Sequence, residues 1–372
     1  MDTPLVEAVA TRWCFAGPRV LELPGAVFGL EEPIAFKVCA NPLLVGGDSV
    51  HRRELLSGLV ALASTSLIPT GHAQAAGTEP RTVTALRAEL VRTRVEFDAC
   101  HYQAVAGLLP ALVADGHRLR DATAGQMKER AESVLADAYS LAAFTADKLG
   151  DWGLSWVLAD RARRHATVSG NPLSVAAATR EAAVAMRRAQ HHGTAAELLT
   201  TTATSLPAET GWDLVGQGSL LLTAAYTHAQ QGDTGAAHDL AAEARGVAAR
   251  LPAWLPSNPI FTASQVPVYE ISIHNALGDP AQALTVARGL RLGQLPSAER
   301  RARVCIDVAR AWHAYGRAEN CLRALEHAER YAPEEVRRGQ IRQFTLGLLE
   351  LPGVAPTGLR VFAARTGADA SL

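Results

Sequence analysis

Hydrophobic residues recur every three or four positions through most of the chain from about residue 80 onward. This spacing puts the apolar side chains on one face of an α-helix, and the strict alternation typical of half-buried strands is nearly absent. Short breaks at Gly, Asp or Pro separate the helical segments. The clearest predicted helices are Met127–Leu149, Gly153–Ser169, Leu173–His191, Thr194–Leu206, Leu214–Gln231, Thr234–Arg250, Ser264–Leu277, Ala281–Leu292, Ala298–Tyr315 and Ala318–Tyr331. The pattern predicts an all-α array.

The predicted helices come in pairs, each joined by a short turn that contains a glycine. These glycines are Gly150, Gly193, Gly232, Gly278 and Gly316. Four of the turns read alike, as LGDWG, QGDTG, LGDPA and YGRAE. A glycine at such a position ends one helix in a left-handed conformation, and the polar residue after it starts the next helix. The chain therefore repeats a helix hairpin.

Small residues occupy most of a set of fixed positions around the turn glycines. In the last hairpin they are Ala309, Cys321, Leu325 and Ala328 around Gly316, and in the third hairpin they are Ala225, Ala237, Ala241 and Ala244 around Gly232. This arrangement resembles the tetratricopeptide (TPR) repeat. The resemblance implies TPR-like helical-hairpin repeats that form a right-handed superhelical solenoid over residues 80–372. A generic helical solenoid is the alternative.

The order of segments before the hairpins carries a second resemblance. An R-R-x-x-L motif begins at Arg52, an apolar segment and a linker follow, and a helix ends in D-A-C-H-Y at Asp98–Tyr102. This order is similar to actinomycete-type transcriptional regulators, in which a Cro/phage-repressor helix-turn-helix precedes a TPR sensor domain. Residues 1–50 contain no readable helix-turn-helix, although PLVEAVATRWCF could form a short helix. We therefore expect an irregular segment at 1–50, an apolar helix and linker at 51–79, and DNA binding only through an N-terminal module or a partner chain.

The segment His51–Ala75 also has the features of an export signal. Paired arginines precede an apolar run, and the run ends in Ala73-Gln74-Ala75, a pattern that signal peptidase accepts. Because 50 residues precede it, we interpret it as a hinge helix, and export is the less favoured alternative. The five scattered cysteines predict reduced thiols and a cytoplasmic protein. The sequence contains no uninterrupted run of 18 apolar residues, so it predicts no membrane span.

Composition and charge narrow the possible functions. The chain is 48% hydrophobic with a mean hydropathy of +0.04, which is too apolar for a disordered chain. Its formal charge of −1 gives no general attraction to nucleic acid. Aromatic residues make up only 5% of the chain, so we expect Ala, Leu and Val to fill the core and the helices to approach closely.

The sequence contains no recognisable catalytic or nucleotide-binding motif. Cys100 and His101 are adjacent, and neighbours on a helix point about 100° apart, so we do not expect them to form a catalytic pair. Cys305, His313, Cys321 and His327 are not expected to converge on zinc. The sequence thus predicts a protein that is not an enzyme and has no cofactor or metal. The alternative is an unrecognised helical enzyme, whose signature would be a deep closed pocket with convergent ionisable groups.

The first helix of each hairpin is expected to line a concave groove, as the resemblance to TPR proteins implies. Its inward-facing candidates are Phe144, Lys148, Arg187, Gln190, Tyr226, Gln230, Gln265, Tyr269, Asn275, Arg303, Arg310 and His313. Amide side chains can bond both polar groups of a peptide backbone, and arginine can hold a carboxylate. We therefore predict a regulatory protein that binds a peptide or protein segment and that could form a homodimer. A scaffold protein without a sensing step is the alternative.

Overall fold

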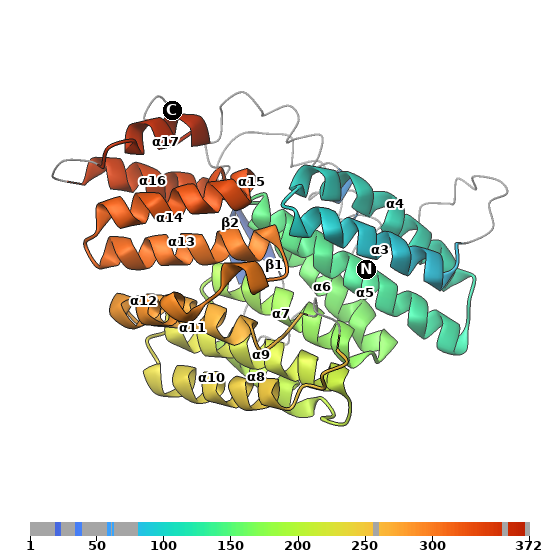
Figure 1. Ribbon diagram of the computed structural model, residues 1–372. Helices are drawn as coiled ribbons and strands as arrows, with labels where there is room; N and C mark the ends of the chain where they lie inside the picture. Colours follow the sequence, from blue (N-terminus) through green and yellow to red (C-terminus); the bar gives the residue numbers. More distant parts are fainter. Residues whose placement is uncertain are drawn as a thin grey trace. The chain divides into compact units, whose positions relative to one another are not determined.

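The computed structural model describes residues 19–23, 34–38, 58–60, 62, 81–255, 260–351 and 356–368 (Figure 1). The chain divides into two compact units, Met1–Thr78 with Leu372, and Glu79–Ser371. No helix among these described residues is long and apolar enough to cross a membrane.

The first unit contains a pair of antiparallel strands that the sequence pattern did not predict. Strand β1 (Arg19–Leu23) pairs with β2 (Ile34–Val38), with Arg19 opposite Val38. The segment that we expected to be irregular therefore contains two short strands, and Gly or Pro residues stand near the ends of both in the sequence. Of the apolar helix predicted within residues 51–79, residues 58–60 and 62 are described, and they are helical. The short helix suggested near the start lies outside the described residues.

The described part of the second unit is built from α-helices and one short 3₁₀ helix, which confirms the all-helical prediction for this region. Its helices are α3 (Val83–Asp98), α4 (Tyr102–Asp121), α5 (Gly125–Lys148), α6 (Trp152–Ser169), α7 (Pro172–Arg188), α8 (His192–Ser205), α9 (Gly211–Gln230), α10 (Thr234–Ala249), α11 (Gln265–Ala276), α12 (Pro280–Gly289), η3 (Leu292–Gln294), α13 (Ala298–Ala314), α14 (Ala318–Tyr331), α15 (Pro333–Val336), α16 (Gly339–Glu350) and α17 (Leu359–Thr366). All ten helices predicted above are present, with ends shifted by a few residues.

The helices of this unit form two rows. Helices α3, α5, α7, α9, α11 and α13 pack side by side in that order. Helices α4, α6, α8, α10 and α12 each pack against two neighbouring members of this row, and α14 packs against α13. We call the first set the inner row. Its last member, α13, also contacts its first member, α3 (Figure 1). The two ends of the inner row therefore meet, and we call the free face of the row, on the side away from α4, α6, α8, α10 and α12, the enclosed face.

The turns between paired helices use left-handed backbone at one residue each. Gly150, Gly232, Gly278 and Gly316 have φ angles of 80°, 78°, 76° and 74°. In the second hairpin the prediction was wrong, because Gly193 lies in the first turn of α8 and the left-handed residue is Gln190, with φ of 67°. The chain turns three residues before the glycine that the pattern indicated.

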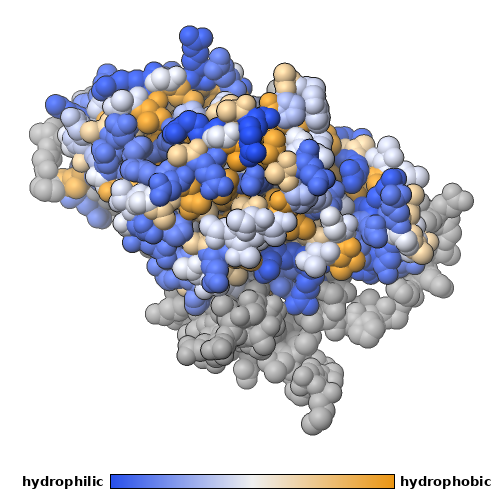
Figure 2. Space-filling view, turned by 90° about the horizontal axis from the view of Figure 1, so that it is seen from below, coloured by the Kyte–Doolittle hydropathy of each residue, from blue (hydrophilic) through white to orange (hydrophobic). Residues whose placement is uncertain are grey.

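Small side chains let the helices approach closely, as the composition predicted. Ala225 and Ala229 of α9 pack against Ala237 and Ala241 of α10 in one buried cluster. Gly218 of α9 lies directly against the ring of the fully buried Phe261. On the face shown in Figure 2, polar residues dominate the coloured surface and apolar residues occur among them in small groups.

Candidate functional site

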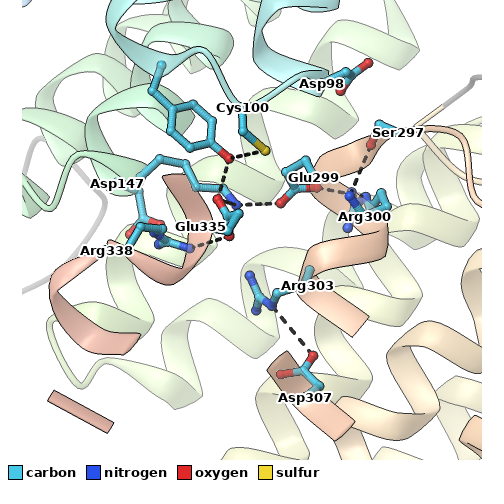
Figure 3. A network of polar contacts seen from close by, with 12 residues as sticks. Asp98, Cys100, Asp147, Ser297, Glu299, Arg300, Arg303, Asp307, Glu335 and Arg338 are labelled. Carbon is cyan, nitrogen blue, oxygen red and sulfur yellow. Dashed lines mark hydrogen bonds and ion pairs between the residues drawn. The ribbon is translucent and has the colours of Figure 1, made fainter. Parts of the chain in front are cut away.

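A buried charge network joins the first hairpins of the second unit to its last helices (Figure 3). Lys148 Nζ lies 2.5 Å from Glu299 Oε1 and 2.9 Å from Glu335 Oε1. The three side chains are 1%, 4% and 0% exposed. The hydroxyl of Tyr102 contacts both Glu335 and the sulfur of Cys100. Two carboxylates thus take the place of water around the Lys148 ammonium. Their negative charge compensates a positive charge that would otherwise be costly to bury.

Helix ends supply the charged residues of this network. Lys148 is in the last turn of α5, and Glu299 is in the first turn of α13. Each side chain therefore has the sign that the dipole of its own helix favours. Burial alone would raise the pKa of Glu299, but Lys148 and Arg300 hold that pKa below its usual value.

Arginines extend the network on the side of α7 and α15. Arg188 Nε donates to Asp147 Oδ1 at 3.1 Å, and Arg338 donates to Glu335 Oε2 at 3.1 Å. Arg338 also lies 3.7 Å from Asp147. Burial disfavours the ionised form of Asp147, yet Arg188 and Arg338 lower its pKa. The carboxylates here are kept charged and paired.

A second group of polar side chains continues along the inner row from α7 to α13. Arg187 donates to Thr227 Oγ1 at 3.0 Å, and its guanidinium lies over the ring of Tyr226. Burial raises the pKa of Tyr269, but Arg180 and Arg300 more than offset this effect and lower it. These contacts show that side chains from separate hairpins meet on the enclosed face.

Asp307 organises the end of this group on α13. Its carboxylate accepts from Ser272 Oγ at 2.7 Å and from Arg310 at 2.9 Å, and Arg303 Nε lies 3.6 Å away. Asn275 donates to the backbone carbonyl of Asp307 at 2.8 Å. Three of the predicted groove residues therefore bind Asp307 or its backbone.

The structure brings most of the predicted groove residues together, but not all of them. Those that face the enclosed side or its polar groups are Phe144, Lys148, Arg187, Tyr226, Gln265, Tyr269, Asn275, Arg303 and Arg310. Gln190 is instead the exposed left-handed turn residue. Gln230 is exposed and donates to the hydroxyl of Tyr226 at 3.3 Å, and His313 packs edge-on against Phe344 of α16.

A cavity of about 260 Å³ lies between α3, α5 and α7, beside the start of α13. Phe144 and Gln265, both predicted as groove residues, line it. Its other polar lining includes Asp137, Ser140 and Glu181, which the sequence did not single out. A signal for them exists, since Asp137 and Ser140 precede Phe144 by seven and four positions and share its helical stripe.

Cys100 and His101 have separate partners, in agreement with the prediction that they do not form a pair. Cys100 is buried against Tyr102, whereas His101 Nδ1 lies 2.7 Å from Glu96. Burial raises the pKa of the Cys100 thiol to about 12 and that of Cys305 to about 11. Among the described residues, no three His, Cys, Asp or Glu side chains are grouped so as to hold a metal ion.

No protein-family model matches the chain, and no curated protein matches it. One solved structure to which the chain is similar is BtubC (BKLC) from P. vanneervenii, with 16% identity over 73% of this chain and 96% of that one. The TM-score is 0.39.

Proposed function

We propose that the chain is a TPR-type regulatory protein whose hairpins form a right-handed superhelix and whose enclosed face binds a peptide or protein segment. The observation that carries the proposal is the packing of Arg187 of α7 over the ring of Tyr226 of α9, with Tyr269 of α11 and Arg303 of α13 close enough to interact electrostatically with this pair. Arginine and tyrosine present hydrogen-bond donors and flat surfaces that suit an extended peptide. A cavity beside them offers space for part of a ligand.

The size of this cavity favours a short segment or the end of a longer one. Pockets for drug-sized ligands measure roughly 300–1,000 Å³. At about 260 Å³, this cavity accepts one or two residues. The rest of a peptide would lie along the polar side chains of the inner row.

The Lys148 network supplies a route from binding to output. Lys148 connects α5 to α13 and α15, so a ligand that displaces these helices would loosen the contact between the two ends of the row. Stacked hairpins add small rotations along the array. The output would be a changed dimer contact or a changed interaction of an N-terminal module or partner chain with DNA, and we place this regulation in the cytoplasm.

Selection of peptides on the protein tests the proposal. Random dodecapeptides displayed on phage are selected on the full chain, and the winners are titrated by fluorescence anisotropy. We expect Arg187→Ala and Tyr226→Ala to weaken binding at least tenfold, because both side chains belong to the enclosed face. Glu243→Ala, on the exposed side of α10, is the control and should bind as the wild type does. Equal affinity for all four proteins, or no selected peptide, would contradict the proposal.

A helical enzyme is the second candidate, because the enclosed face gathers ionisable groups as such an enzyme would. Most of these groups are already paired with each other, as Lys148 is with Glu299 and Arg188 is with Asp147. The described residues that line the cavity include no His, Cys or Lys. The arrangement favours binding over catalysis. The other alternative is a scaffold protein without a sensing step. It predicts a constant protein partner whose affinity for the chain is unchanged by the selected peptides.

A further inference from the structure

Three helices of the inner row each contribute one stripe of side chains to the cavity. From α5 the stripe contains Asp137, Ser140, Leu141 and Phe144, at spacings of three and four residues. Helices α3 and α7 supply both apolar and charged residues. Because the stripes belong to helices that pack side by side, the cavity is part of the fold and its walls are fixed by helix packing.

Most charged groups that line the cavity already have a partner of opposite sign. Arg94 Nε lies 3.2 Å from Asp98, and Arg180 lies 3.3 Å from Glu181. Arg300 lies 3.6 Å from the buried Glu299. Because these charges compensate each other, the paired residues leave little net charge in the cavity for a ligand to neutralise.

Asp137 differs from these residues because it forms no ion pair with any residue that the structure describes. Burial raises the pKa of Asp137 to about 6, and a hydrogen bond from Ser174 and the charge of Arg87 offset only part of that effect. A carboxylate that is removed from water gains most from a cation that contacts it directly.

Ser140 provides an independent observation one helical turn further along α5. Ser140 lines the cavity and is 8% exposed. Its hydroxyl has no hydrogen-bond partner among the described residues. Buried hydroxyls almost always have a partner, so an unsatisfied one at a cavity wall marks a position where a ligand atom or a water molecule would accept or donate a hydrogen bond. Leu90, Leu173 and Ala177 line the same cavity and give it an apolar wall.

We propose that this cavity binds a primary ammonium group attached to a small apolar body, with the Asp137 carboxylate pairing with the ammonium and Ser140 Oγ accepting one of its hydrogen bonds. The inference rests on the proposed function and specifies it, since the free N-terminus of a peptide has this chemistry. A free alkylamine has the same chemistry, and the test below distinguishes the two sources.

Isothermal titration calorimetry at pH 7 tests the proposal with three probes. They are leucyl-alanine amide, its N-acetylated form and isopentylamine. The amine of the first probe is largely protonated at this pH, because α-amino groups have pKa values near 8 (roughly 7.7–8.0). We expect the wild-type chain to bind the free peptide amide at least tenfold more tightly than the acetylated one. Isopentylamine binding as tightly as the peptide would identify a free amine as the source, and weaker binding would identify a peptide end.

Variants then assign the effect to the cavity. Asp137→Asn should weaken binding of the free amide at least tenfold, and Ser140→Ala should weaken it severalfold. Ala177→Phe should abolish binding by filling the cavity. If circular dichroism shows that Asp137→Asn does not fold, Ala177→Phe alone tests whether the cavity is the binding site. Asp239→Asn, an exposed change on α10, is the matched control and should have no effect.

Three results would overturn the inference: equal affinity for free and acetylated peptide, unchanged affinity in both Asp137→Asn and Ala177→Phe, or no binding of either amine by the wild type. Failure of the inference is distinct from failure of the proposed function. If phage-selected peptides still lose affinity with Arg187→Ala and Tyr226→Ala, the enclosed face binds peptides and only the ammonium site is wrong.

Discussion

Lys148 Nζ lies 2.9 Å from Glu335 Oε1, although 187 positions separate the two residues in the chain. This ion pair and the one between Lys148 and Glu299 connect the end of α5 to α13 and α15. The contact of α13 with α3 closes the inner row at the same end. The two ends of the row therefore meet, and the enclosed face carries polar side chains that are buried or half-buried.

Replacing Lys148 by Met should destabilise the protein by about 3–5 kcal/mol, because it removes the ammonium that the buried Glu299 and Glu335 share and leaves each carboxylate paired with one arginine. Urea unfolding followed by circular dichroism measures the change in free energy of unfolding. Lys128→Met is a matched control, since Lys128 lies on the same helix but is exposed. A similar small effect for both substitutions would show that the buried network contributes nothing.

The turn residue Gln190 gives a second prediction. Its φ of 67° is the left-handed conformation, in which a side chain costs about 1 kcal/mol relative to glycine. Gln190→Gly should therefore raise the free energy of unfolding by about 1 kcal/mol, and Gly232→Ala, at the equivalent turn, should lower it by a similar amount. Thermal melts of both variants check this, and a destabilised Gln190→Gly variant would contradict the common turn geometry.

Close approach at Gly218 gives a third prediction. A methyl group on Gly218 would collide with the ring of Phe261, so Gly218→Ala should destabilise the protein by about 1–3 kcal/mol. Gly246→Ala, in an exposed part of α10 with open space around it, should instead stabilise by up to about 1 kcal/mol. Opposite signs in urea unfolding are expected, and equal signs would be inconsistent with this packing.

Asp137 gives a pH dependence whose sign follows from its raised pKa. The pKa of Asp137 is about 6 in the folded state, whereas the ordinary pKa of an aspartate, which applies in the unfolded chain, is 3.8. Between these values the folded state binds more protons, so the wild type loses stability as the pH rises. The Asp137→Asn variant has no carboxyl to ionise at this position, so it does not lose this stability as the pH rises.

The stability gained by Asp137→Asn over the wild type should therefore increase between pH 4.5 and pH 7.5, by about 1–3 kcal/mol. The comparison cancels other titrating groups, including the nearby Glu181, because both proteins contain them. Urea unfolding of both proteins at the two pH values measures the difference. A difference that shrinks or stays constant would contradict a desolvated Asp137 carboxyl whose contacts with Ser174 and Arg87 only partly offset the loss of water.

The sequence predicted the helices from their local periodicity, and the resemblance to TPR repeats indicated which helices would contribute most of the residues on the enclosed face. Phe144, Arg187 and Tyr226 could be placed on one face since a helical stripe repeats every three or four residues. The turn at Gln190 was missed because a glycine nearby was the stronger signal. One further signal was available: Lys148 is one of three lysines in a chain whose other basic side chains are mainly arginine.

The closure of the row could not be predicted in the same way. The periodicity of apolar residues indicates which face of a helix is apolar. The curvature of a stack of helix hairpins depends instead on small rotations at every contact between helices. Glu299 and Glu335 look like ordinary helix-start carboxylates in the sequence. Their burial depends on the contact with α5, which is far away in the chain. For the same reason Asp137 and Ser140 gain their significance only from the cavity that three helices form around them.

Photo-crosslinking tests most directly whether the enclosed face is the binding surface. Benzoylphenylalanine is placed at position 226 in place of Tyr226, and in a second protein at position 243 in place of Glu243 on the outer side of α10. After irradiation with a phage-selected peptide, the account predicts a crosslink from position 226 that excess unlabelled peptide suppresses, and none from position 243. A suppressible crosslink from position 243 with none from position 226 would contradict it.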